Sequence, residues 1–293
     1  MNDVIRMVLG GLRGKMNKTI GQLATRSVVA IESEATVQEA LQIMCDRCIS
    51  CIIVLSHNEP IGILTERDIV FAANWLLGQP DLLVKEVMNK PVMTVSEDMS
   101  VVQAHQLFCQ HGIRHLVVLD SRLEMFGIFT QTDMVRSLKE KAFSGVQDVS
   151  QLMTDQVLHV APDVPARYAL SLMARRSVSC IVVVENGQPV GMFTERDVVR
   201  CVAEGVDLSG VPVSAVMSYS IVSTPLTSAP YETIGLMLKK SIRRLLVTDE
   251  LGGMTGILTQ TDIGRVLEQQ ESGLVSTLLG DSGKASGVEP GFV

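Results

Sequence analysis

The chain has 293 residues, of which 46% are apolar, 19% are charged and only 4% are aromatic. Its formal net charge of −7 argues against a broad nucleic-acid-binding surface, which normally carries an excess of basic residues. No apolar run reaches the roughly 20 residues of a membrane-spanning helix, and the N-terminal stretch lacks the cleavage pattern of a secretory signal. The composition therefore predicts a cytoplasmic, globular protein with an aliphatic core.

Four stretches of the chain repeat one order of predicted elements. Each begins with a short apolar strand, continues as a helix with apolar residues at helical spacing, and then forms a β-branched central strand. A returning strand and a second helix complete the unit, and Asn186-Gly187 is a strong signal for the hairpin turn in the third copy. The predicted first helices are 36–45, 100–109, 166–175 and 230–239, and the predicted central strands are 52–55, 116–119, 180–184 and 245–248. The pattern predicts an α/β fold of four β-α-β-β-α repeats.

A heptapeptide of the form Gly-h-h-Thr-x-x-Asp, where h is hydrophobic, closes each repeat. Its glycines are separated by 65, 64 and 65 residues: Gly62, Gly127, Gly191 and Gly256. The first and third copies contain Thr-Glu-Arg-Asp, whereas the second and fourth contain Thr-Gln-Thr-Asp. The duplicated unit is therefore a pair of repeats, copied at an offset of 129 residues.

Turn-rich joints separate the repeats, and the joint at Ser144-Gly145 divides the chain into two halves. We expect an N-terminal extension at 1–15, a first module at 16–142 and a second module at 146–268. The sequence beyond Glu271 is rich in Gly and Ser, which predicts a flexible C-terminal tail at 269–293.

Two explanations fit the heptapeptide. A Thr with an acid three residues later resembles a helix capping box, and a glycine in the returning strand suits a close backbone approach. Capping alone requires neither Asp in all four copies nor the fixed glycine. A short acceptor at a helix N-terminus, beside N–H groups that attract anions, also suits a ribose that carries a phosphate. The residues by themselves leave both explanations open.

The fourfold pattern resembles the CBS-domain family, with the repeats arranged as two tandem (Bateman) modules from about Ile20 to Val266. The resemblance implies that two repeats pack about a pseudo-twofold axis and form two clefts per module for adenine nucleotides or related adenosyl ligands. The implied ligand is AMP, ADP or ATP, with S-adenosylmethionine, NAD(H) or a cyclic dinucleotide as alternatives, and no cofactor is required. The implied ribose-binding residues are Thr65, Asp68, Thr130, Asp133, Thr194, Asp197, Thr259 and Asp262.

The family also tends to place basic residues for the phosphates at the start of the central strand. The second and fourth repeats (the even repeats) carry basic residues at this position, whereas the first and third (the odd repeats) have Ser-Cys. The signatures of the odd repeats instead contain an arginine, which could point towards the sister cleft. We therefore hypothesise one strong phosphate site per module. The first combines Arg114, His115, Thr130 and Asp133 with Arg67, and the second combines Arg243, Arg244, Thr259 and Asp262 with Arg196. Alternatively, the central-strand arginines are solvated strand-edge residues, and His115 could also titrate near neutral pH.

Three cysteines have the spacing of metal ligands: Cys45, Cys48 and Cys51. The equivalent positions of the third repeat are Ala174, Ser177 and Cys180, so we expect small buried side chains rather than a metal site. The sequence contains no dinucleotide-binding glycine motif, phosphate loop or hydrolase elbow, so we expect no catalytic residue.

The leading hypothesis is a regulatory protein that senses adenine nucleotides and signals to an effector protein. We expect a homodimer formed through the CBS modules, and neither a nucleic-acid nor a membrane partner. The alternative is an interaction scaffold in which the repeats form a dimerisation surface and the clefts stay empty. The sequence does not decide whether the two modules of one chain pair with each other.

Overall fold

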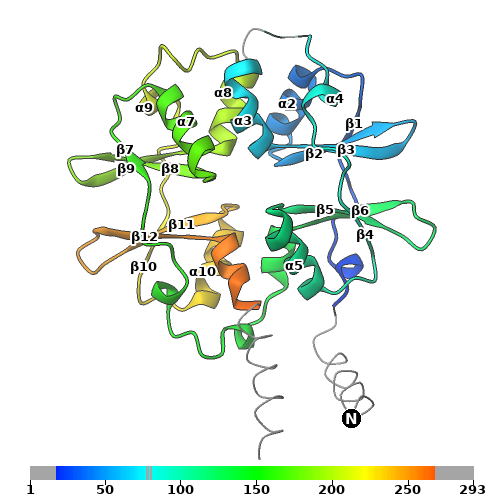
Figure 1. The fold of residues 1–293 in the computed structure, drawn as a ribbon. Coiled ribbons are helices and arrows are strands. Elements are labelled where there is room, and N and C mark those ends of the chain that lie inside the picture. Colours follow the sequence, from blue (N-terminus) through cyan, green and yellow to red (C-terminus); the bar gives the residue numbers. More distant parts are fainter. Residues whose placement is uncertain (1–17, 77–78, 80, 268–293) are drawn as a thin grey trace, which may run out of the picture.

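The computed structural model describes residues 18–76, 79 and 81–267, so the expected extension at 1–15 and the expected tail at 269–293 lie outside the described residues. Four repeats occupy the four quadrants of a disc, with the N-terminal pair on the right of Figure 1 and the C-terminal pair on the left. Among the described residues, no helix is long and apolar enough to cross a membrane.

The first two repeats follow the predicted element order. The first contains β1 (Ala30–Glu32), α2 (Val37–Asp46), β2 (Cys51–Ser56), β3 (Glu59–Thr65) and α3 (Glu66–Leu76). The second contains α4 (Val84–Val87), β4 (Thr94–Ser96), α5 (Val101–His111), β5 (His115–Leu119), β6 (Met125–Thr130) and α6 (Gln131–Ser137). The helix predicted at 36–45 begins one residue later because Thr36 is its cap, with Thr36 Oγ1 accepting a hydrogen bond from the Glu39 N–H at 3.2 Å.

The last two repeats have the same order. The third contains β7 (His159–Val160), α7 (Ala166–Arg176), β8 (Cys180–Glu185), β9 (Gln188–Thr194) and α8 (Glu195–Ala203). The fourth contains α9 (Val213–Val216), β10 (Ser223–Pro225), α10 (Pro230–Lys239), β11 (Arg244–Thr248), β12 (Met254–Thr259) and a helix over 260–267. Short 3-10 helices lie at Ile20–Gln22, Glu140–Phe143 and Val149–Gln151.

Each repeat folds as a three-stranded sheet covered by helices. The first strand pairs parallel with the central strand, and the returning strand pairs antiparallel with it, in the orders β1-β2-β3, β4-β5-β6, β7-β8-β9 and β10-β11-β12. Asn186 and Gly187 both have positive φ, as the predicted tight hairpin between β8 and β9 requires. The α/β architecture of four β-α-β-β-α repeats is confirmed.

Sheets pack within a module, and helices pack between modules. Ile53 of β2 meets Val117 and Ile128 of the second repeat, which joins the first two sheets. An equivalent apolar cluster joins the last two sheets. The two large cores are instead helical: one joins the first and third repeats, where α3 packs on α8, and the other joins the second and fourth (Figure 1). The two modules of one chain therefore pair with each other through these helices.

The segment that leads into each repeat crosses to the returning strand of its sister. Thr25, before the first strand, exchanges two backbone hydrogen bonds with Ile128 of β6, at 2.9 and 3.0 Å. The other three repeats make the equivalent pairs, Asn89 with Ile63, Thr154 with Ile257 and Ser218 with Met192. The signature glycine stands next to each crossing, and a β-carbon at Gly127 would lie 2.8 Å from the Thr25 carbonyl oxygen. At Gly127 the glycine is thus required by the close approach of two backbones, whereas at the other three glycines the nearest atom is the sulfur of a methionine side chain.

This crossing predicts that the substitution Gly127→Ala lowers the free energy of unfolding by about 1–3 kcal/mol, the usual cost of overpacking. The contacted atom belongs to the backbone and cannot rotate away. Urea denaturation of the whole chain measures the effect.

The matched control is Gly235→Ala in α10, where an added β-carbon has no heavy atom within 4 Å. Alanine is the better helix former, so this variant gains up to about 1 kcal/mol. Equal effects of the two substitutions would contradict the close-approach explanation.

Candidate functional site

All four signatures form the same capping box. The Thr65 hydroxyl donates to Asp68 Oδ2 at 2.7 Å, and the Asp68 N–H donates to Thr65 Oγ1 at 3.4 Å. In the other three copies the hydroxyl lies 2.6 to 2.7 Å from the carboxylate: Thr130 with Asp133, Thr194 with Asp197, and Thr259 with Asp262. Capping therefore explains one carboxylate oxygen of each signature and leaves the other, Oδ1, for further partners.

An arginine three residues after the signature binds Oδ1 in three of the four copies. Arg136 donates to Asp133 at 3.0 Å, and the same ion pair joins Arg200 to Asp197 and Arg265 to Asp262. Sequence reasoning missed these arginines, although they extend the repeated motif to Thr-x-x-Asp-x-x-Arg. The first copy differs because its equivalent residue is Phe71.

Without that arginine, Asp68 Oδ1 accepts a hydrogen bond from the amide of Asn89, at 2.6 Å. Burial raises the pKa of the Asp68 carboxyl and outweighs the hydrogen bonds from Thr65 and Asn89. The first signature thus has a different electrostatic environment from the other three.

A cavity of about 330 Å³ contains the second signature. Thr130 and Asp133 line it opposite Ser50 and Cys51, which lie at the start of the central strand of the first repeat. Apolar side chains complete its walls: Val28, Val29, Ile49, Ile128, Met237 and Leu238. Three arginines bring positive charge to it, Arg136 from its own repeat and Arg196 and Arg243 from the other module.

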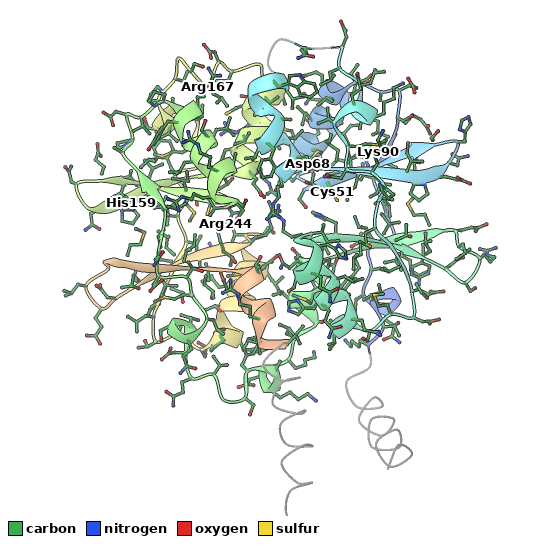
Figure 2. All side chains as sticks on the ribbon, in the orientation of Figure 1. Cys51, Asp68, Lys90, His159, Arg167 and Arg244 are labelled. Atoms are coloured by element: carbon green, nitrogen blue, oxygen red, sulfur yellow. The ribbon has the colours of Figure 1, made fainter. Side chains whose placement is uncertain are left out.

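A second cavity, of about 290 Å³, contains the third signature threonine, Thr194. Residues around the central strand of the fourth repeat line it, including Arg243 and Arg244. Arg196 and Lys240 also line this cavity, so it contains four cationic side chains. In Figure 2, Arg244 and Cys51 lie towards the junction of the four repeats, whereas His159 lies near the outer edge. Arg244 of this cavity therefore lies towards the inner part of the disc.

The structure corrects the expected grouping of these residues. Arg243 and Arg244 share a cavity with Thr194 rather than with Thr259 and Asp262. The cavity that holds Thr130 and Asp133 is lined by Ser50 and Cys51 and not by the expected Arg114, His115 and Arg67. The physical reason is the crossing of the lead segments, which places the central strand of one repeat opposite the signature of its sister.

The remaining ribose candidates lie elsewhere. Thr65, Asp68, Thr259 and Asp262 form capping boxes but line neither of these two cavities. Asp197 lines a third cavity, of about 430 Å³, between the first and third repeats.

Four of the six phosphate candidates bind buried glutamates of the opposite module. Glu195 of α8 accepts hydrogen bonds from Arg114 at 2.7 Å and from Arg67 at 3.5 Å. Glu66 of α3 accepts from Arg196 at 3.2 Å and also from Arg243. Burial acts to raise the pKa of Glu66, but Arg243 and Arg196 outweigh it and hold that pKa below its ordinary value. Both glutamates are about 1% exposed.

The contacts of the even signatures are also reciprocal. The Thr132 hydroxyl donates to Gln260 Oε1 at 2.8 Å, and the Thr261 hydroxyl donates to Gln131 Oε1 at 3.2 Å. The Glu-Arg residues of the odd signatures thus contact each other across the two modules, and so do the Gln-Thr residues of the even signatures. Sequence reasoning treated Glu66 and Glu195 as variable positions, although each stands beside an arginine in the same copies.

Three further arginine contacts reach other repeats. Arg67 Nη1 donates to the Gly112 carbonyl oxygen at 2.7 Å and so reaches the sister repeat, as expected. Arg196 Nη2 donates to the Cys48 carbonyl oxygen at 3.4 Å, which lies in the first module rather than in its own. Arg244 is buried, and its guanidinium donates to the Ser179 carbonyl oxygen at 2.8 Å. All three contacts cross between repeats.

His115 is buried at the start of β5, where its Nε2 lies 2.9 Å from the Ser50 hydroxyl oxygen. Burial is the main cause that lowers its pKa to about 3, and the charge of Arg114 adds to the effect. The expectation that His115 titrates near neutral pH is therefore wrong, because a buried imidazole beside arginines remains uncharged.

The six cysteines all lie in the described part of the chain, and none of them forms a disulfide there. Burial raises the pKa of the Cys51 thiol to about 12. Within the described ranges, no three His, Cys, Asp or Glu side chains are grouped so that they could hold a metal ion.

The geometry defines a tandem-repeat α/β protein with clefts between paired repeats. The family model described as "CBS domain" matches four segments, residues 20–74, 84–140, 148–204 and 213–269. These segments coincide with the four structural repeats and account for most of the sequence. The chain belongs to the CBS-domain family.

The chain is similar to two relatives and one solved structure. It is 33% identical to the uncharacterized protein MK0525 of Methanopyrus kandleri over 120 aligned residues. The aligned residues cover 40% of this chain and 61% of that protein. It is 25% identical to the uncharacterized protein MJ1404 of Methanocaldococcus jannaschii over 280 aligned residues. The aligned residues cover 89% of this chain and 65% of that protein. The chain thus spans less than two thirds of the length of both relatives.

The crystal structure of protein MJ1225 from Methanocaldococcus jannaschii matches with a TM-score of 0.75 at 19% identity, and covers 86% of this chain and 100% of that one. This likeness shows the fold.

The environment of His115 predicts a loss of stability on mild acidification. Its pKa is about 3 in the folded chain and 6.5 ordinarily, so only the unfolded chain takes up the proton between these values. The free energy of unfolding then falls by up to about 1.4 kcal/mol per pH unit below pH 6.5 because of this one group. Urea titrations at pH 7, 6 and 5 measure the slope.

The substitution His115→Gln removes this part of the slope, whereas His159→Gln, at an exposed position, leaves it in place. A wild-type slope in His115→Gln would show that His115 is not the responsible group.

Proposed function

We propose that the chain is a regulatory protein that binds an adenine nucleotide or a related adenosyl ligand between its CBS repeats and transmits the change to a partner protein. The observation that carries this proposal is the cavity of about 330 Å³, which combines a signature Thr-Asp pair, apolar walls and three arginines. Membership of the CBS-domain family supports it, because the resemblance to that family implies clefts for adenine nucleotides or related adenosyl ligands.

Each part of the cavity suits one part of a nucleotide. The Asp133 carboxylate is a short, fixed acceptor whose Oδ1 accepts a hydrogen bond from Arg136, and ribose hydroxyls can donate to it in the same way. The apolar residues, such as Val28 and Ile49, offer a surface for the base. Arg196 and Arg243 are suited to phosphate because a guanidinium binds it through paired hydrogen bonds.

The cavity around Thr194 supports the same class of ligand with more negative charge. It gathers Arg196, Lys240, Arg243 and Arg244 within about 290 Å³. Cationic side chains confined to a cleft attract anions more strongly than they would on an open surface. A triphosphate suits this cavity better than a monophosphate.

Regulation is favoured over catalysis by the state of the signature carboxylates. Each accepts hydrogen bonds from its own threonine on one oxygen and from a neighbouring side chain on the other. These hydrogen bonds hold each carboxylate in place and leave it further lone pairs, which can accept from a ribose hydroxyl, and a fixed acceptor suits the positioning of a ligand better than proton transfer.

The alternative is an interaction scaffold with empty clefts, and ligand-dependent stability separates the two functions. A ligand at 100 times its dissociation constant adds about 2.7 kcal/mol to the free energy of unfolding. Under the proposal, at least one of AMP, ADP, ATP, S-adenosylmethionine, NAD(H) and the cyclic dinucleotides gives this increase. No increase with any of them favours the scaffold.

The site assignment predicts that Asp133→Ala weakens binding of the active ligand at least about tenfold, since a hydrogen bond to a charged group contributes about 1.5–3 kcal/mol. Isothermal titration calorimetry measures this. Asp68→Ala is the matched control, because it removes the same capping carboxylate from a signature outside both arginine-lined cavities. Loss of tight binding in Asp68→Ala, with binding intact in Asp133→Ala, would refute the assignment.

A further inference from the structure

Arg196 and Arg243 both line the same two cavities and both bind one buried carboxylate, and Arg196 also lines the third cavity together with Glu66. Both line the cavity of Thr130 and Asp133 and also the cavity of Thr194. Both also donate to Glu66, whose side chain is 1% exposed, while the side chains of Arg196 and Arg243 are 48% and 21% exposed. The arginines are thus open to a ligand on one side and bound to a glutamate on the other.

A carboxylate and a phosphate are the two anions that a guanidinium binds best, and both use the same N–H groups. We propose that Glu66 is a resident competitor for the phosphate of the ligand: its carboxylate occupies Arg196 and Arg243, and an anionic ligand displaces it. This inference rests on the proposed function for the identity of the ligand and adds how its binding is regulated.

The exchange links ligand binding to the contact between the two modules. Glu66 is the first residue of α3 in the first module, whereas Arg196 lies in the first turn of α8 and Arg243 precedes β11 in the second. The helices α3 and α8 pack against each other across the module boundary. A buried carboxylate that loses its cationic partners is strongly destabilising, so Glu66 must move when a phosphate takes its place. Ligand binding therefore disturbs the start of α3 and its contact with α8.

Glu195 provides the matched control because it makes the same contacts in the opposite direction. It is equally buried and binds two arginines of the other module, Arg67 and Arg114. Neither of these arginines lines the two cavities. Removing the charge of Glu195 therefore breaks comparable ion pairs, but it leaves Arg196 and Arg243 bound to Glu66.

The test is calorimetric titration of ATP, adenosine and inorganic tripolyphosphate into the full chain and its variants Glu66→Gln and Glu195→Gln. Glutamine keeps the size of the side chain and an acceptor oxygen but removes the charge. We expect Glu66→Gln to bind ATP and tripolyphosphate at least about tenfold tighter than the wild type, as expected for freeing a charged hydrogen-bond partner. Adenosine, which has no phosphate, binds both alike, and Glu195→Gln stays near the wild type.

Unchanged or weaker tripolyphosphate binding by Glu66→Gln would overturn the proposal, and so would an equal gain in Glu195→Gln. Tripolyphosphate separates this inference from the proposed function. If no nucleotide binds but tripolyphosphate binds Glu66→Gln more tightly, the nucleotide function fails and the competition stands.

Glu66→Asp is the second variant, for the case in which Glu66→Gln does not fold. It retains the charge but is one methylene shorter, so it holds the two arginines less well. Its affinity for tripolyphosphate is expected to lie above that of the wild type, and an affinity equal to or below the wild type would overturn the proposal.

Discussion

The backbone pairing between each lead segment and the returning strand of the sister repeat is the constraint on which the rest of the structure depends. The pair of hydrogen bonds between Thr25 and Ile128 is one of four such crossings. Each brings two sheets together and so builds a module. Each also places the central strand of one repeat opposite the signature of its sister. In the cavities of Thr130 and Thr194, the pairing of a signature with the sister strand therefore follows from a contact between backbones, whereas Arg196 and Arg243 reach the first cavity from the other module.

A second constraint comes from the buried ion pairs between the two modules. Taking Glu66 and Glu195 out of water is costly, and it is tolerated because two arginines bind each carboxylate. A shift of one module along the other would leave a buried carboxylate unpaired. The apolar helical cores supply most of the driving force for pairing, whereas the ion pairs select one arrangement among many apolar ones.

The repeated elements could be predicted from the sequence because their signals are local. Apolar periodicity, capping residues such as Thr36 and the turn at Asn186-Gly187 act within a few residues of one another. The grouping of cleft residues could not be predicted in this way, since Arg243 and Thr194 come to line one cavity only through the packing of two repeats. The same holds for Glu66, whose partners lie more than 120 residues away in the chain. Periodicity identifies equivalent residues but does not show which of them touch.

The reciprocal contacts have a consequence for assembly. Glu66 with Arg196 and Glu195 with Arg67 are one contact made twice, as at the interface of a symmetric dimer. A dimer of separate modules would dissociate on dilution, whereas two modules of one chain stay at a fixed effective concentration. Because the two modules belong to one chain, their sequences can also differ. Phe71 of the first module, for example, occupies the position equivalent to Arg200 of the second. The disc is thus a symmetric assembly whose clefts are individually free to differ.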